Sequence, residues 1–185
     1  MRLFVALNFP AALRQGLWDG TAPLRALDLP VRWVAPEGIH LTLKFLGDVA
    51  EGRLDEMSDA LDGAVRGVRP FTVTVGGLGA FPGPARPAVI WAGVGADPAL
   101  ELLQHAVERA FGPLGFPPDG RPFRPHVTLG RVRRDARTGA FADLERHLAT
   151  LTWSDAVVVD SADLMRSTTG PKGAVYEELR HGRLS

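Results

Sequence analysis

HLTLKFLG at residues 40–47 and HVTLGR at residues 126–131 share the order His-x-Thr-Leu and lie 86 residues apart. Both stretches are rich in β-branched and apolar residues and contain a glycine near their end, which is typical of strands. Side chains alternate along a strand, so each histidine shares a face with the following threonine, while Leu41 and Val127 point the other way. Each strand is therefore predicted to face a core on one side and to carry polar groups on the other.

The segments around these two stretches predict strands interleaved with helices. Further strands are expected at residues 2–8, 31–34, 71–75, 87–94, 152–159, 163–166 and 174–180. Helices are expected from Pro10 to Leu27, at residues 48–67, after Asp97-Pro98 and at residues 141–148. The glycine- and proline-rich stretch 76–87 is expected to be a loop. Because several strands are half-polar, an α+β fold is favoured over parallel winding.

The composition narrows the chemistry that this chain can perform. A chain of 185 residues, 45% of them hydrophobic, can bury a substantial core, and no apolar run reaches the length of a membrane span. The N-terminus has no signal-peptide pattern, so we expect a cytoplasmic protein. Because the chain has no cysteine, disulfides, thiolate nucleophiles and Cys-ligated metal sites are excluded. Catalysis must come from histidine, carboxylate, hydroxyl or basic side chains.

Arginine gathers around the second His-x-Thr-Leu stretch. Lys+Arg and Asp+Glu are both 21, so the charge of the whole chain gives no signal for nucleic-acid binding. Between residues 121 and 137, however, only Asp135 opposes six arginines, namely Arg121, Arg124, Arg131, Arg133, Arg134 and Arg137. This run is either a solvated loop or a phosphate-binding surface, because the guanidinium fork matches phosphate oxygens.

Two imidazoles and two hydroxyls around one small volume suit the cleavage of a phosphodiester. One histidine can take a proton from the attacking water while the other gives a proton to the departing alkoxide. Thr42 and Thr128, with nearby cations, would hold the phosphoryl oxygens. These groups offer too few ligands for a zinc site, and no nucleophile elbow supports a Ser/His/Asp triad. The competing interpretation is that His40 and His126 are structural residues.

The other histidines provide a comparison within the chain. None of His105, His147 and His181 is followed by threonine two residues later, and the first two fall on predicted helices. We assign no functional role to any of the three.

The two motifs resemble the paired motifs of the 2H phosphoesterase superfamily, and most closely those of the RNA 2′,3′-cyclic phosphodiesterases of the LigT/ThpR type, also called 2′-5′ RNA ligases. The likeness extends to MRLFVAL at the N-terminus, to RPAVIWAGV at residues 86–94 and to the spacing of Leu164, Ser167, Gly173 and Tyr176. It implies a bilobal α+β fold in which two pseudo-twofold-related lobes each contribute one His-x-Thr-Leu strand. Antiparallel-rich sheets would line a central cleft with helices outside, and residues 1–185 would form a single domain.

The resemblance also implies an activity, the opening of RNA 2′,3′-cyclic phosphates to 2′-phosphomonoesters without a metal or another cofactor. An ATP-independent 2′-5′ joining of tRNA halves is associated with the same family. Carried over by motif position, His40 is the proton donor to the leaving 3′-oxygen and His126 is the proton acceptor that activates water. Thr42, Thr128 and Arg131 are implied to contact the phosphate. The expected partners are RNA ends, and we expect a monomer with no obligate protein partner.

Other side chains near the motifs have two interpretations. Strict alternation points Arg131 away from His126, so its contact with phosphate requires a β-bulge at Gly130. Lys44 is expected on the face of His40. There it would either add positive potential or lie at the edge of the cleft without direct contact to the substrate. Trp33, Phe81 and Phe123 could stack on a base, although core packing is the favoured interpretation of each.

Two alternative functions stay open. A non-catalytic protein could bind RNA ends through the same residues, but binding alone needs no pair of titratable groups around one phosphate. Alternatively, the protein could be a phosphodiesterase of the same superfamily that acts on a small cyclic phosphate, such as one on ADP-ribose, or on a 2′-5′ oligonucleotide. The shared motifs bind the phosphate, whereas the loops determine which molecule carries it.

Overall fold

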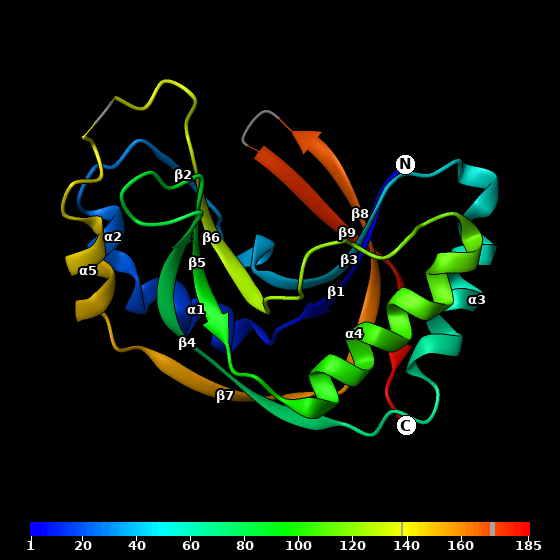
Figure 1. The fold of residues 1–185 in the computed structure, drawn as a ribbon. Helices are drawn as coiled ribbons and strands as arrows, with labels where there is room; N and C mark the ends of the chain where they lie inside the picture. The colour runs from blue at the N-terminus through cyan, green and yellow to red at the C-terminus, as the bar shows by residue number, and fades with distance from the viewer. Residues whose placement is uncertain (138, 171–172) are drawn as a thin grey trace.

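The computed structural model describes residues 1–137, 139–170 and 173–185, in which nine strands form one curled sheet (Figure 1). The strands are β1 (Arg2–Asn8), β2 (Val31–Trp33), β3 (His40–Asp48), β4 (Phe71–Phe81), β5 (Val89–Val94), β6 (His126–Val132), β7 (Ser154–Val159), β8 (Ser161–Gly170) and β9 (Gly173–Arg183). Their order is β7-β4-β5-β6-β3-β1-β8-β9, and β2 pairs with β6 beside β3. All of these pairings are antiparallel, as the half-polar strands predicted.

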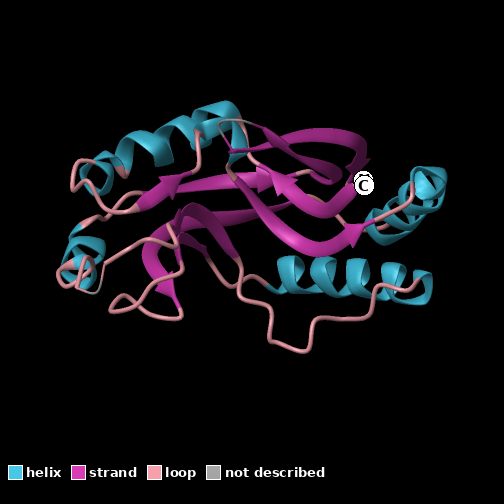
Figure 2. Ribbon diagram, turned by 90° about the horizontal axis from the view of Figure 1, so that it is seen from above, coloured by secondary structure: helices cyan, strands magenta, loops and turns pink. Residues whose placement is uncertain are grey.

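The helices flank the sheet (Figure 2). They are α1 (Ala11–Gly20), α2 (Ala22–Arg25), α3 (Leu54–Val65), α4 (Pro98–Phe111) and α5 (Leu144–Thr150), with 3₁₀ turns η1 (Pro36–Gly38), η2 (Glu51–Arg53) and η3 (Gly112–Leu114). In Figure 1, α3 and α4 lie beside the half of the sheet that contains β8, whereas α1, α2 and α5 lie beside the other half. No helix in the described ranges combines the length and apolar character required to cross a bilayer.

The two histidine strands lie at the centre of the sheet. The halves β7-β4-β5-β6 and β3-β1-β8-β9 meet where Leu41 of β3 pairs with Val127 of β6. Both of these side chains are fully buried in the main hydrophobic core. The α+β class with an antiparallel-rich sheet and outer helices is therefore confirmed, with the two parts of the sheet joined at this single pair in the described residues.

The sheet has a second face, turned away from the main core, which we call the open face. A small apolar cluster of Phe4, Ala6 and Met165 lies there, with Tyr176 packed against it. On β1, Phe4 and Ala6 alternate with Leu3, Val5 and Leu7, which belong to the main core. Since His40 and His126 alternate with Leu41 and Val127 in the same way, both histidines lie on the open face.

The predicted loop at residues 76–87 is wrong for its first half, because β4 continues to Phe81. The glycines that suggested a loop serve a close approach of side chains instead. A Cβ on Gly79 would clash with the Trp91 ring, and Gly77, at φ +69°, lies at a bulge in the pairing with β5. Glycine in this strand therefore makes room for a large neighbouring ring.

Most helix predictions are confirmed, with shorter bounds. The segment 48–67 begins with the end of β3 and η2, and α3 starts only at Leu54. The segment after Pro10 divides at Thr21, whose hydroxyl donates a hydrogen bond to the Leu17 carbonyl at 2.7 Å. At α4, the Asp97 carboxylate accepts hydrogen bonds from the first turn, as an N-cap residue does.

Candidate active site

Matching β-bulges shape the two histidine strands. Relative to β1, β3 carries an extra residue at Leu43, and relative to β5, β6 carries an extra residue at Leu129. These leucines occupy the same place in the two His-x-Thr-Leu motifs. Each bulge reverses the alternation of the side chains that follow it.

The bulge at Leu129 returns Arg131 to the open face. Gly130 turns toward the core, where an added Cβ would lie 2.5 Å from Val31 Cγ1 and 2.9 Å from Trp33 Cε3. Arg131, the next residue, is exposed on the opposite side. The bulge that a phosphate contact by Arg131 requires is therefore present, one residue before the predicted position. The same geometry turns the Trp33 ring toward the core, so it is not placed to stack on a base at the open face.

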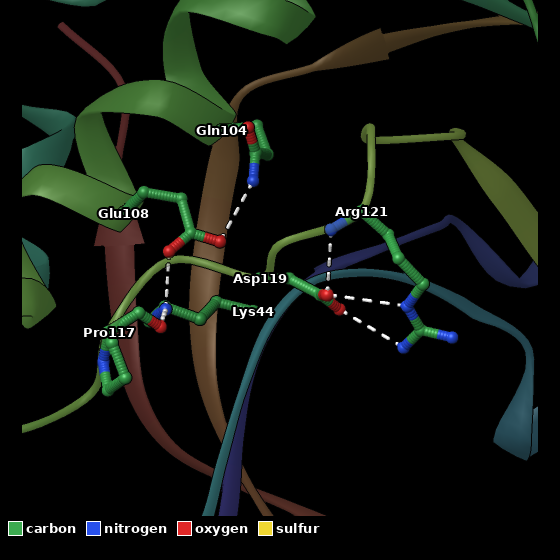
Figure 3. A network of polar contacts seen from close by, with 6 residues as sticks. All are labelled: Lys44, Gln104, Glu108, Pro117, Asp119 and Arg121. Atoms are coloured by element: carbon green, nitrogen blue, oxygen red, sulfur yellow. Dashed lines mark hydrogen bonds and ion pairs between the residues drawn. The ribbon is translucent and has the colours of Figure 1, made fainter.

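The bulge at Leu43 turns Lys44 into the core, so the expectation that it shares the face of His40 is wrong. Lys44 is 5% exposed and forms an ion pair with Glu108 of α4 (Figure 3). Its ammonium group also donates to the Pro117 carbonyl at 3.0 Å, and Gln104 donates to Glu108 at 3.1 Å. Lys44 thus ties β3 to α4 and to the segment that leads into β6, on the side of the sheet opposite the histidines.

The register of β3 and β6 brings the four motif side chains together. Leu41 pairs with Val127 in the antiparallel sense. Continued by one residue on each side, this register sets His40 opposite Thr128 and His126 opposite Thr42. Side chains directly across an antiparallel pair have Cβ atoms about 5 Å apart. The two imidazoles therefore lie diagonally across a small area, each beside the other strand's threonine.

Both imidazoles are held in the same way by the backbone. His40 Nδ1 lies 2.8 Å from the Gly38 carbonyl oxygen, and His126 Nδ1 lies 2.7 Å from the Arg124 carbonyl oxygen. A carbonyl only accepts, so Nδ1 carries the proton in each ring and donates it. This leaves Nε2 of each neutral ring as a free proton acceptor, or as a donor once the ring is protonated.

Aromatic rings pack against both histidines. The rings of Phe4 and Tyr176 each have their centroids 4.9 Å from that of His40, and the Phe81 ring lies edge-on to His126 at 5.0 Å. Of the three stacking candidates from the sequence, Phe81 is therefore the one in contact with a motif histidine. Phe123 is partly buried against the main core, in agreement with the favoured interpretation.

This packing changes the acidity of His40. Burial lowers the pKa of His40 from 6.5 to about 4, because the charged imidazolium loses hydration. The hydrogen bond to Gly38 raises this pKa, and the positive charge of Arg131 lowers it further. His40 is therefore neutral at pH 7 in the ligand-free protein, and the charge of Arg131 acts at the histidine site.

The arginine-rich stretch is less positive than its sequence suggests. Arg121 pairs with Asp119 at 3.2 Å and Arg133 pairs with Asp135 at 2.8 Å, and all four side chains are exposed. Surface pairs of this kind add little stability, but they engage two of the six guanidinium groups. Arg131 forms no ion pair with a carboxylate in the part of the chain that the structure describes.

Sequence reasoning missed the groups that hold the histidines. Phe4 and Tyr176 come from strands far from His40 in the chain, and Tyr176 stood out only as part of the family pattern. The carbonyls of Gly38 and Arg124 carry no side-chain signal. Each carbonyl belongs to the residue two positions before its histidine. This shared position becomes visible only in the backbone geometry.

One group of side chains within the described ranges could hold a metal ion, and it lies outside the His-x-Thr motifs. Ligand atoms of Asp163, Glu178 and His181, on β8 and β9, lie within 4.8 Å of one another. His181 Nδ1 is 2.9 Å from Asp163 Oδ1, and Asn8 donates to the other carboxylate oxygen at 2.8 Å. His181, which we assigned no functional role, is thus a partner of a buried carboxylate.

Solved structures with a similar fold are known. The chain is similar to a crystal structure of a Thermus thermophilus protein, with a TM-score of 0.83, 28% identity and coverage of 100% of this chain and 98% of that one. It is also similar to E. coli LigT complexed with 3′-AMP, with a TM-score of 0.77, 27% identity and the same coverage.

Sequence relatives and a family model agree with these structures. The RNA 2′,3′-cyclic phosphodiesterase of Methanothermobacter thermautotrophicus is 33% identical over 184 residues, covering 100% of this chain and 99% of the relative. The protein of the same name from Archaeoglobus fulgidus is 34% identical over 180 residues, covering 97% and 98%. The family model for the 2′-5′ RNA ligase superfamily matches residues 15–171. This chain therefore belongs to the 2′-5′ RNA ligase superfamily, a group of 2H phosphoesterases.

Proposed function

We propose that this protein hydrolyses 2′,3′-cyclic phosphates at RNA ends to 2′-phosphomonoesters, with His40 and His126 as its acid/base pair. The observation that carries the proposal is the matched pair of imidazoles on adjacent strands. Each has Nδ1 bound to the carbonyl two residues earlier and Nε2 left for proton transfer. The names of the relatives support the cyclic phosphate as substrate.

The reaction needs one proton acceptor and one proton donor on opposite sides of phosphorus. Water attacks phosphorus while His126 Nε2 accepts its proton, the bond from phosphorus to the 3′-oxygen breaks, and His40 Nε2 donates a proton to that oxygen. The diagonal arrangement of the histidines suits this in-line displacement. The hydroxyls of Thr42 and Thr128 and the guanidinium of Arg131 stabilise the negative charge on the phosphoryl oxygens. No step requires a metal ion.

The low pKa of His40 sets a condition on its role as proton donor. A neutral imidazole has no proton to give from Nε2, so the ligand-free protein is not yet in its donor form at pH 7. A bound cyclic phosphate carries one negative charge next to the ring, and a nearby opposite charge raises the pKa of an imidazole. We propose that substrate binding itself protonates His40.

We therefore expect the His40 ring to titrate near pH 4 in the ligand-free protein and at clearly higher pH when adenosine 2′-phosphate occupies the site. NMR titration of the imidazole Cε1–H signals measures both values, with exposed His105 on α4 as the internal control. If His40 still titrates near pH 4 with the nucleotide bound, the roles are reversed, and His40 is the base.

A 2′-5′ joining reaction at the same site is a further part of the proposal. If the 5′-hydroxyl of another RNA takes the place of water, the same proton transfers yield a 2′-5′ phosphodiester, and the energy comes from the strained cyclic phosphate instead of ATP. tRNA halves with these ends are the substrates that we propose for it. The monomeric state and the cytoplasmic location stay predictions from the sequence.

A direct assay tests the proposed hydrolysis. Protein treated with EDTA should open the 2′,3′-cyclic phosphate of a short RNA without any added nucleotide. Loss of activity in the chelator that zinc or manganese restores would contradict the metal-free mechanism. A protein that binds the RNA without turnover would be the non-catalytic alternative.

A further inference from the structure

A second arginine lies directly beside Arg131 on the open face. In the pairing of β2 with β6, Arg32 is opposite Arg131, and both side chains are exposed. The neighbouring residues of β2, Val31 and Trp33, point the other way, toward Gly130. Arg32 and Arg131 therefore project from the same face, with Cβ atoms about 5 Å apart.

Two like charges directly across a β-ladder repel each other unless an anion lies between them. No carboxylate forms an ion pair with Arg32 or Arg131 in the described residues, whereas Arg133, two positions further along, pairs with Asp135. Two adjacent guanidinium groups offer the donor geometry that phosphate oxygens accept. The pair is thus suited to a phosphate from outside the chain.

The position of this pair relative to the histidines indicates which phosphate it would bind. Arg131 lies three residues beyond Thr128 on β6, with the bulge at Leu129 between them, and in the proposed mechanism its guanidinium contacts the reacting phosphate. β2 continues the same edge of β6 that β3 occupies, so Arg32 lies beyond His40 on that flank. Arg131 therefore lies between the histidines and Arg32, so Arg32 faces the next phosphate along the RNA strand.

We infer that Arg32 forms a second phosphate site that binds the 5′-phosphate of the terminal nucleotide, with Arg131 shared between this phosphate and the cyclic phosphate at the histidines. The inference rests on the proposed function and deepens it. It makes the substrate an RNA end with at least one further phosphodiester, because a nucleoside cyclic phosphate with a free 5′-hydroxyl has nothing to place there.

Two small substrates isolate this site. Adenosine 2′,3′-cyclic phosphate has only the reacting phosphate, whereas its 5′-phosphorylated form adds the group that the arginine pair would bind. The wild-type protein should have at least a roughly tenfold lower KM for the 5′-phosphorylated form, as expected for a charge-assisted hydrogen bond. Added salt should weaken that preference.

Arg32→Ala should remove most of the preference while leaving turnover of the 5′-hydroxyl substrate unchanged, and Arg32→Lys should restore part of it. Arg109→Ala, at an exposed position on α4, removes the same charge away from the site and should keep the full preference. A wild-type protein that opens both substrates with equal KM would overturn the second site but leave the proposed hydrolysis standing. A preference that survives Arg32→Ala would overturn the assignment of Arg32. Failure to open either substrate would instead count against the proposed function.

Discussion

His40→Ala and His126→Ala are each expected to lower kcat for the opening of a 2′,3′-cyclic phosphate by roughly 10²–10⁴, the usual contribution of a positioned proton-transfer group. Each ring presents a free Nε2 because its Nδ1 is bound to a backbone carbonyl. Steady-state kinetics on a cyclic nucleotide measure the loss. Thr42→Ala and Thr128→Ala should cost less, because each removes one of several contacts to the phosphate.

The controls separate catalysis from folding. His40 packs against two aromatic rings, so His40→Gln, which keeps most of the side-chain volume without a group that titrates near neutral pH, should be measured beside His40→Ala. His105→Ala, on the exposed face of α4, should keep full activity. The wild-type rate should be bell-shaped in pH, since one histidine must be neutral and the other protonated. A folded His40 or His126 variant with near-wild-type turnover would show that the residue is structural.

Lys44→Met or Glu108→Leu is expected to lower the free energy of unfolding by about 3–5 kcal/mol. Each substitution leaves the other charge buried without its partner, since Lys44 is 5% exposed and Glu108 is 9% exposed. The double variant Lys44→Met/Glu108→Leu removes both charges and keeps the volume, so it should lose much less than the two single changes added together. Denaturant unfolding of the four proteins measures this coupling. Single variants within about 1 kcal/mol of the wild type would mean that the pair contributes little.

The sequence predicted the central strands and the face that carries their polar side chains because alternation along a strand is a local property. His40 and Thr42, like His126 and Thr128, share a face whatever surrounds them. The position of Lys44 could not be predicted in the same way, since the bulge at Leu43 exists only through the pairing of β3 with β1. For Arg131 the need for a bulge was visible in the sequence, but its presence depends on β5.

Other features depend on contacts between distant parts of the chain. The low pKa of His40 results from burial to which Phe4 of β1 and Tyr176 of β9 contribute. No sequence pattern near residue 40 predicts that either ring packs against it. Gly76, Gly77 and Gly79 suggested a loop, whereas Gly79 admits the ring of Trp91 from the neighbouring strand β5. Arg32 stood alone in the sequence, and only the register of β2 against β6 places it beside Arg131.

The position of the phosphate in the product tests the central claim most directly. An RNA oligonucleotide ending in a 2′,3′-cyclic phosphate should be opened in ¹⁸O-labelled water, and the product examined by ³¹P NMR and mass spectrometry. We predict a single 2′-phosphomonoester that carries one ¹⁸O atom on phosphorus, because water attacks phosphorus and only the bond to the 3′-oxygen breaks. A 3′-phosphomonoester, release of inorganic phosphate or an unopened cyclic phosphate would contradict this account.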